Sequence, residues 1–173
     1  YVDSTFYKPL GLTRMTYLPR EKFSKDRIVP TENDKYFRRQ ILQGNVHDPG
    51  AALYGGVAGH AGLFSNALDL AQIMQLLLNK GSYNGKQFFK PETVVYFTKQ
   101  YDSRSRRGLG FDKPEPDSAK QSPCCERTPL STFGHTGFTG TCVWSDPSNN
   151  LTIVFLSNRV YPDADNPKLV RMG

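Results

Sequence analysis

The residues best suited to chemistry lie in one short run, Gly134-His135-Thr136-Gly137-Phe138-Thr139-Gly140-Thr141. It combines one imidazole, three threonine hydroxyls and three glycines. Glycine lets the backbone approach a ligand closely and adopt conformations that other residues avoid. An apolar run, residues 142–144, follows at once. The pattern therefore predicts a strand end, a tight turn and a new strand, with polar groups held at the break.

Two interpretations of this run remain open from its spacing alone. In the first, backbone N–H groups and hydroxyls along a sheet edge bind an extended acyl substrate and stabilise an oxyanion, with His135 beside them. In the second, the glycines serve a β-bulge and the threonines are ordinary strand residues. The residue types do not decide between a functional edge and a structural hairpin.

Other catalytic and metal-binding signatures are absent from the sequence. It has no Gly-x-Ser-x-Gly elbow, and no serine has a lysine three positions later. His47 and His60 do not form a zinc-type spacing. The three cysteines, Cys124, Cys125 and Cys142, give no zinc knuckle. We therefore expect no metal and no other cofactor, and the spacing of residues identifies no nucleophile.

The elements around these residues are predicted as helices first and an antiparallel sheet last. Residues 65–81 carry apolar side chains at helical spacing, with Ser65 as the N-cap and Gly81 as the stop. A second helix is expected from Pro91. Strands are expected at 133–136, 141–145 and 151–157.

The remaining segments are predicted to be surface connections. Residues 18–43 are polar and are expected to cover the surface as a long excursion. Residues 108–111 are compatible with the start of a strand, and the proline-rich stretch that follows reads as an exposed connection. The order indicates an α+β fold in one incomplete domain, 1–173. Its predicted parts are a mainly helical part, an exposed connection and a sheet part, at 1–101, 102–131 and 132–173.

Composition excludes several classes of protein. The hydrophobic content of 38% and charged content of 22% are those of a globular chain. The net charge is +6, but the cations are scattered among acids rather than gathered on one face, so we expect no nucleic-acid partner. No apolar run approaches the ~20 residues that span a membrane.

Five segments, in this order, resemble the serine β-lactamase and penicillin-binding-protein-like hydrolases, near the class C β-lactamases and related esterases. They cover nearly the whole chain and are Phe6–Leu12, Gly55–Ser65, Gly108–Phe111, Gly134–Gly137 and Leu156–Pro162. The stretch from His135 through Pro162 is also similar to the β-lactamase-like region attached to family 3 glycoside hydrolases in some Bacteroides-type bacteria.

The resemblance implies a β-lactamase/transpeptidase-like fold and an acyl-enzyme mechanism on ester, amide or peptidoglycan-like substrates. Of the family's three motifs, this chain carries only the strand motif, His135-Thr136-Gly137; Ser-x-x-Lys and Tyr-x-Asn are not found. By resemblance, the backbone N–H of Phe138 is one oxyanion donor. Substrate contacts are expected from Thr139, Asn158 and Asp163.

Two departures from the class C pattern bear on substrate. Asp163 follows Tyr161-Pro162, where class C β-lactamases have an amide near the substrate carboxylate, and a carboxylate there repels a carboxylate substrate. Histidine replaces lysine at His135 and carries a less permanent positive charge. The resemblance therefore favours an esterase or a peptidase acting on peptidoglycan-like material over efficient β-lactam hydrolysis.

We therefore interpret the chain as the C-terminal part of such a domain, without the catalytic serine and the family's final helix, and expect it to be inactive alone. A sheet without its covering helices exposes an apolar face, so we expect self-association or an upstream domain of the same gene product as partner. The alternatives are a non-catalytic module that binds cell-wall or glycan ligands, and a structural domain of a fused glycosidase. The family alone suggests a periplasmic or exported location.

Overall fold

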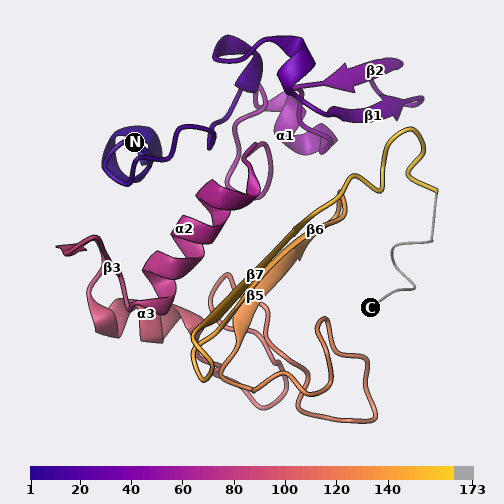
Figure 1. The fold of residues 1–173 in the computed structure, drawn as a ribbon. Coiled ribbons are helices and arrows are strands. Elements are labelled where there is room, and N and C mark those ends of the chain that lie inside the picture. Colours follow the sequence, from indigo (N-terminus) through magenta and orange to yellow (C-terminus); the bar gives the residue numbers. More distant parts are fainter. Residues whose placement is uncertain (166–173) are drawn as a thin grey trace. The chain divides into compact units, whose positions relative to one another are not determined.

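The computed structural model describes residues 1–165, which form two compact units (Figure 1). The first contains residues 1–69 and 157–165 of the described chain, and the second contains residues 70–156. One boundary between the units falls within helix α2 (Ala67–Leu78). Helices and antiparallel sheets are both present, as an α+β fold requires. Within residues 1–165, no helix is long and apolar enough to cross a bilayer.

The first unit combines short helices with one hairpin. Its elements are η1 (Asp3–Tyr7), η2 (Pro19–Glu21), η3 (Lys25–Arg27), β1 (Pro30–Asp34), β2 (Gln40–Gln43) and α1 (Pro49–Leu53). The first helix ends just before the turn Pro9-Leu10-Gly11, where Gly11 has a φ of +73°. Such a left-handed conformation at a helix end favours glycine.

The prediction that residues 18–43 cover the surface as a long excursion is only partly correct, because β1 and β2 pair as an antiparallel hairpin that is partly buried. Leu42 on β2 is only 2% exposed and belongs to the core. The charged side chains of this segment, which suggested exposure to solvent, form ion pairs with one another. The Arg38 guanidinium lies 2.8 Å from the Asp34 carboxylate and 2.9 Å from that of Glu32.

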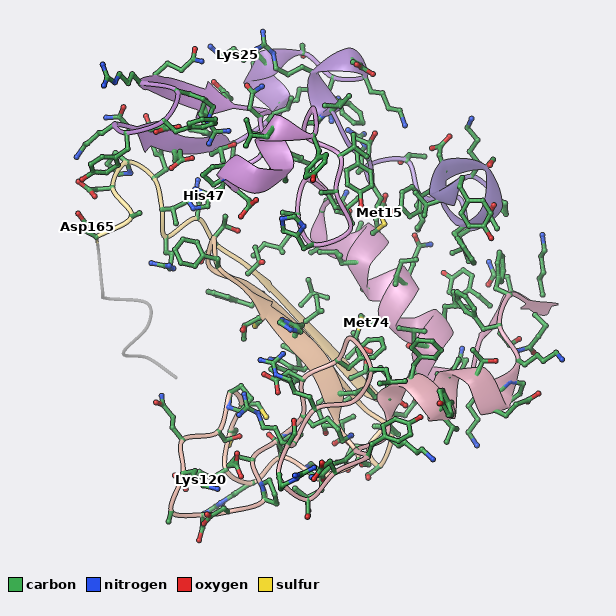
Figure 2. The ribbon with its side chains drawn as sticks, turned by 180° about the vertical axis from the view of Figure 1, so that it is seen from behind. Met15, Lys25, His47, Met74, Lys120 and Asp165 are labelled. Atoms are coloured by element: carbon green, nitrogen blue, oxygen red, sulfur yellow. The ribbon has the colours of Figure 1, made fainter. Side chains whose placement is uncertain are left out.

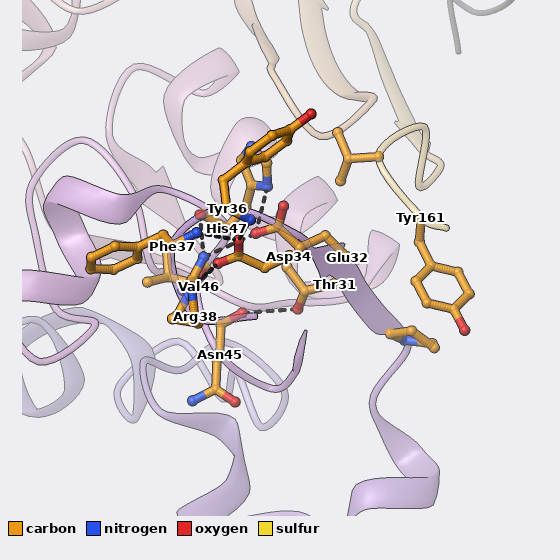
Figure 3. Close-up of polar contacts among 12 residues, drawn as sticks. Thr31, Glu32, Asp34, Tyr36, Phe37, Arg38, Asn45, Val46, His47 and Tyr161 are labelled. Atoms are coloured by element: carbon orange, nitrogen blue, oxygen red, sulfur yellow. Dashed lines mark hydrogen bonds and ion pairs between the residues drawn. The ribbon is translucent and has the colours of Figure 1, made fainter. Parts of the chain in front are cut away.

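Asp34 and Arg38 together fix the turn of this hairpin (Figure 3). The Asp34 carboxylate accepts main-chain N–H bonds from Tyr36, Phe37 and Arg38, at 2.9–3.0 Å. Arg38 also donates to the carbonyl oxygens of Val46 and His47, at 2.5 and 2.7 Å. The hydrogen bond from Arg38 is the main reason that the pKa of Asp34 lies well below its ordinary value.

Helix α2 lies where its apolar spacing predicts it, but its cap differs. Asn66, not Ser65, caps the helix: its side-chain oxygen accepts the N–H of Asp69 at 2.9 Å. The Ser65 hydroxyl instead donates to the Asn66 carbonyl at 3.3 Å. Met74 and Leu76 are buried, whereas Leu68 is 75% exposed.

The second unit carries the three-stranded sheet. Besides most of α2 it contains β3 (Ser82–Tyr83), β4 (Lys86–Gln87), α3 (Pro91–Thr98), β5 (Phe133–Gly137), β6 (Thr141–Asp146) and β7 (Leu151–Leu156). The strands β5, β6 and β7 lie in that order, each antiparallel to the next. The helix from Pro91 and these three strands confirm the predictions from spacing.

The segment before β5 differs from the prediction at residues 108–111. These residues form no strand, because the N–H of Gly108 donates to the carbonyl of Phe111 at 3.0 Å and closes a local turn. The next residue, Asp112, exchanges two main-chain hydrogen bonds with Gly134 of β5. Residues 113–131 then form an irregular connection. Lys113 at its start is only 7% exposed, so the connection is not exposed throughout, contrary to the prediction. The expected absence of the family's final helix concerns residues after Pro162, most of which lie outside the described range.

Candidate functional site

The run around His135 forms β5 and the turn that follows it. His135 and Thr136 are exposed on the strand and pair with Val143 and Cys142 of β6. The glycine before them is required by packing: a Cβ on Gly134 would lie 2.0 Å from the carbonyl oxygen of Val143. β5 and β6 therefore lie too close together for any residue other than glycine at position 134.

The turn between β5 and β6 contains the next two predicted site residues, Phe138 and Thr139. Phe138 is 64% exposed. The turn is closed by a hydrogen bond from the N–H of Gly140 to the carbonyl of Gly137, at 3.0 Å, with Gly140 at a φ of +101°. A Cβ on Gly137 would meet the hydroxyl of Thr141 at 2.4 Å. The glycines of the motif are thus explained by a tight hairpin, and the hairpin presents His135, Thr136 and Phe138 at one exposed end of the sheet.

His135 lies beside a cation that sequence reasoning did not single out. Its Nε2 is 3.1 Å from Nη1 of Arg107, and its Nδ1 is 2.6 Å from the carbonyl oxygen of Thr136. A carbonyl oxygen can only accept, so Nδ1 carries the proton and donates. The free electron pair of Nε2 then accepts an N–H of Arg107. The permanent positive charge that histidine lacks is supplied by this guanidinium.

Asp112 fixes the arginines next to β5. Its carboxylate receives a two-point contact from Arg106, at 2.7 and 2.9 Å, and lies 3.4 Å from Arg107. Asp112 is only 2% exposed. Burial raises its pKa, but the hydrogen bonds from Arg106 and the Lys113 N–H and the nearby positive charges outweigh this effect, so its pKa is lowered. Asp112 is therefore a buried carboxylate that remains charged, and it pairs with Arg106 and with Arg107, the arginine that contacts His135.

No signal in the sequence joins Arg107 to His135, because 28 positions separate them and the intervening connection is irregular. The mixture of positive and negative side chains in this connection is typical of a solvated surface. The one available hint was the glycine-rich turn at residues 108–111, which belongs to the family resemblance and leads directly into Asp112. Its pairing with Gly134 is what brings the arginines to the strand.

Asn158 and Asp163 belong to the first unit, not to the unit that contains His135. The Asn158 amide donates to the carbonyl oxygens of Pro30 and Thr31, and its oxygen accepts the N–H of Val160 at 3.2 Å. Asp163 forms an ion pair with Lys35 at 2.7 Å, and this hydrogen bond lowers the pKa of Asp163. Both predicted substrate contacts are therefore engaged with groups of their own unit.

Within residues 1–165, no group of three or more histidine, cysteine, aspartate and glutamate side chains is arranged to hold a metal ion. His60 pairs with Asp48, 3.1 Å from its Oδ1, in the glycine-rich loop after α1. The chemistry available at β5 is thus recognition of negative charge: a guanidinium, an imidazole, hydroxyls and main-chain groups of an edge strand.

A family model described as "Beta-lactamase" matches residues 1–171. Relatives from Salmonella gallinarum and Salmonella newport, both named "Putative D-alanyl-D-alanine carboxypeptidase", are 38% identical to this chain over 181 residues. Each alignment covers 98% of this chain but 42% of the relative. The chain therefore spans about two fifths of the length of the curated relatives that it matches.

Solved structures show the same fold. A β-lactamase from Mycobacterium bovis superposes with a TM-score of 0.57 and 19% identity, over 99% of this chain and 53% of its own. A penicillin-binding protein homologue from Caulobacter crescentus gives 0.59 and 21%, over 91% and 45%. Simvastatin synthase from Aspergillus terreus gives 0.59 and 17%, over 99% and 47%.

The predicted β-lactamase/transpeptidase-like fold is thus confirmed. The family match extends over nearly all of the sequence and includes β5 with its His-Thr-Gly motif. The chain belongs to the beta-lactamase family.

Proposed function

We propose that this chain forms the substrate-binding wall of a serine-type carboxypeptidase-like hydrolase that acts on peptides ending in D-alanine. The observation that carries the proposal is the Arg107 guanidinium, held 3.1 Å from His135 on an exposed strand end. The family and the names of the relatives support the reaction class. This is an inference for the whole protein, because the chain spans about two fifths of the length of these relatives.

A peptide that ends in a carboxylate suits this strand. Arg107 offers a planar pair of N–H donors that matches a carboxylate in two-point contact. Thr136 and Thr139 add hydroxyl donors. The extended peptide lies along β5. The N–H of Phe138 donates a hydrogen bond to the oxygen of the scissile carbonyl as that oxygen becomes negative. Arg107 thus supplies the fixed positive charge that a lysine would carry at position 135.

The covalent step requires a serine outside these 173 residues. Its oxygen attacks the carbonyl before the terminal D-alanine, and a bond forms between serine oxygen and carbonyl carbon. The C–N bond breaks, and the leaving amine takes the proton given up by the serine. Water then cleaves the ester, which releases the shortened peptide as a carboxylic acid and restores the hydroxyl.

Binding is tested with the isotopically labelled chain. Titration with an acetylated peptide ending in D-Ala-D-Ala should shift the backbone amide signals of residues 135–139, and its C-terminal amide should bind about tenfold more weakly, as loss of one charge-assisted contact predicts. Arg107→Gln should remove this preference. Arg104→Gln is the matched control, because Arg104 is 89% exposed and pairs only with Asp102 among the contacts of the described residues. Equal affinity for acid and amide would refute the role of Arg107.

Catalysis is tested separately. The chain alone should not turn over nitrocefin, a p-nitrophenyl ester or the D-Ala-D-Ala peptide, and the same assays with the intact gene product should show release of D-alanine. Turnover by the chain alone would show that it contains its own nucleophile and would overturn this part of the proposal. Ester cleavage without D-alanine release would favour an esterase.

The same experiments distinguish two alternative functions from the proposed one. A non-catalytic cell-wall or glycan-binding module would bind muropeptide sugars with no preference for a terminal carboxylate. A structural domain of a fused family 3 glycosidase would bind neither. Sequencing the gene on both sides for Ser-x-x-Lys, Tyr-x-Asn, a glycosidase domain and an export signal tests the fusion and the proposed periplasmic location.

A further inference from the structure

The charged groups near His135 balance one another when the imidazole is neutral. Arg106 contacts the Asp112 carboxylate at 2.7 Å and the Glu115 carboxylate at 3.7 Å. Arg107 lies 3.4 Å from the same Asp112 carboxylate. Although burial raises it, the pKa of Asp112 is held below its ordinary value by the Arg106 contacts, so this carboxylate stays charged where imidazoles titrate. Two guanidinium groups and two carboxylates thus form a set with no net charge.

The strand β6, which pairs with β5, brings no charge next to His135 within residues 1–165. Val143 is paired directly with His135, and Cys142 is paired with Thr136. Burial raises the pKa of the Cys142 thiol, so the thiol stays neutral near pH 7. The Thr136 carbonyl accepts the Nδ1 proton of His135 at 2.6 Å. The opposite ring nitrogen, Nε2, is therefore the atom at which gain of a proton changes the charge of the set.

A carboxylate bound at Arg107 would disturb this balance. It would give the set a net negative charge, because the Arg107 charge is already matched by Asp112. The electron pair on Nε2 of His135 accepts an N–H of Arg107 at 3.1 Å, and the same electron pair repels a carboxylate oxygen. A proton on Nε2 turns the repelling atom into a donor and returns the net charge to zero. A ligand that favours the protonated imidazole must, by linkage, bind more tightly as the pH falls.

We propose that binding of a peptide carboxylate at Arg107 is coupled to uptake of one proton by Nε2 of His135. The inference rests on the proposed function, because it concerns the charge of that same site. In the free protein, the neutral imidazole accepts the Arg107 N–H. When the peptide binds, a proton from solvent adds to Nε2, and the Arg107 N–H turns from Nε2 to the carboxylate. The imidazolium and the guanidinium then both donate to the carboxylate.

The coupling is tested with the isotopically labelled 173-residue chain and the acetylated peptide ending in D-Ala-D-Ala. NMR titrations at about pH 5.5 and about pH 7.5, at one ionic strength, span the range in which an imidazole changes its charge. The terminal carboxyl of the peptide titrates near pH ~3.5 and stays ionised in both. The dissociation constant should be about fivefold lower at the acidic pH, the effect of one exposed charge contact. The C-terminal amide of the peptide should bind equally at both.

A glutamine at position 135 separates the two roles of the imidazole. The amide oxygen of His135→Gln can still accept the Arg107 N–H, but the side chain has no titratable charge. The preference for acid over amide should therefore remain, and its pH dependence should disappear. His60→Gln is the control, because His60 pairs with Asp48 in the first unit and its loss should leave the fivefold change intact.

The remaining histidine, His47 (Figure 2), also belongs to the first unit, where it lies 3.0 Å from Glu32. A preference for acid over amide that is the same at both pH values would refute the coupling and leave the proposed function standing. So would a pH dependence that His135→Gln retains. Equal affinity for acid and amide at both pH values would refute both the coupling and the proposed function.

Discussion

A single buried carboxylate determines whether His135 has a cation beside it. Asp112 contacts both Arg106 and Arg107, and it bonds through its main chain to Gly134. The side chain and the main chain of one residue thus fix both the strand edge and the charge next to it. This arrangement connects the stability of the second unit with its proposed recognition of carboxylates.

Asp112→Asn should destabilise the chain by about 3 kcal/mol at neutral pH, because it removes the buried carboxylate that pairs with the partly exposed Arg106 and Arg107 and puts an uncharged amide in its place. The folded pKa of Asp112 lies below its unfolded value of ~3.9, so its contribution is present above that pH and is lost as the pH falls through it towards the folded pKa. Urea unfolding should therefore show a difference between wild type and variant that shrinks in acid.

Asp117→Asn is the matched control, because the Asp117 side chain is 47% exposed and its ion pair with Lys120 is 3.4 Å long. The expected cost is small, as for other surface ion pairs. A loss for Asp112→Asn no larger than that of the control, or one that does not depend on pH, would contradict the assigned role of Asp112.

At the level of elements, the β5–β6 hairpin depends on the absence of side chains at two positions. Gly134→Ala should cost about 3 kcal/mol in urea unfolding, because its Cβ would lie 2.0 Å from the Val143 carbonyl and the strands must separate. Amide hydrogen exchange in β5 should also accelerate. Gly59→Ala is the comparison, because nothing lies within 4 Å of its Cβ and its φ is not left-handed. Unfolding of both variants at the same urea concentration would contradict the inferred clash between a side chain at position 134 and β6.

At the scale of the whole chain, the three-stranded sheet leaves apolar side chains exposed on one strand. Leu151, Ile153 and Phe155 alternate along the edge strand β7 and are 48–52% exposed. Their alternation places them on one face of the sheet. An unpaired edge with an apolar face favours association with a second copy or another chain.

We expect the 173-residue chain to sediment with a mass that rises with concentration, and Ile153→Lys to shift it towards the monomer by about tenfold in dissociation constant. Val29→Lys is the control, since Val29 is 70% exposed but lies outside the sheet. Analytical ultracentrifugation measures both variants. A wild-type chain that remains monomeric at every concentration would argue against self-association through β7.

Much of the fold could be predicted from the sequence wherever the signal is local. The apolar repeat gave α2, Pro91 marked the start of α3, and alternation with a glycine-rich turn gave β5, β6 and β7. The hairpin β1–β2 could not be predicted in this way. Its charged side chains read as exposed, and only the bonds of Arg38 to Asp34 and Glu32 make that composition compatible with a partly buried position.

By itself, the sequence determined the family, the His-Thr-Gly strand and the glycines that its turn requires, because these depend on residue type and short spacing. The tertiary structure alone decided which charges meet. It brought Arg107 to His135 across 28 positions, engaged Asp163 with Lys35, and left Lys113 buried without a carboxylate within the described residues. Such pairings depend on how distant segments pack, and electrostatic energy depends on separation and burial in space rather than on position along the chain.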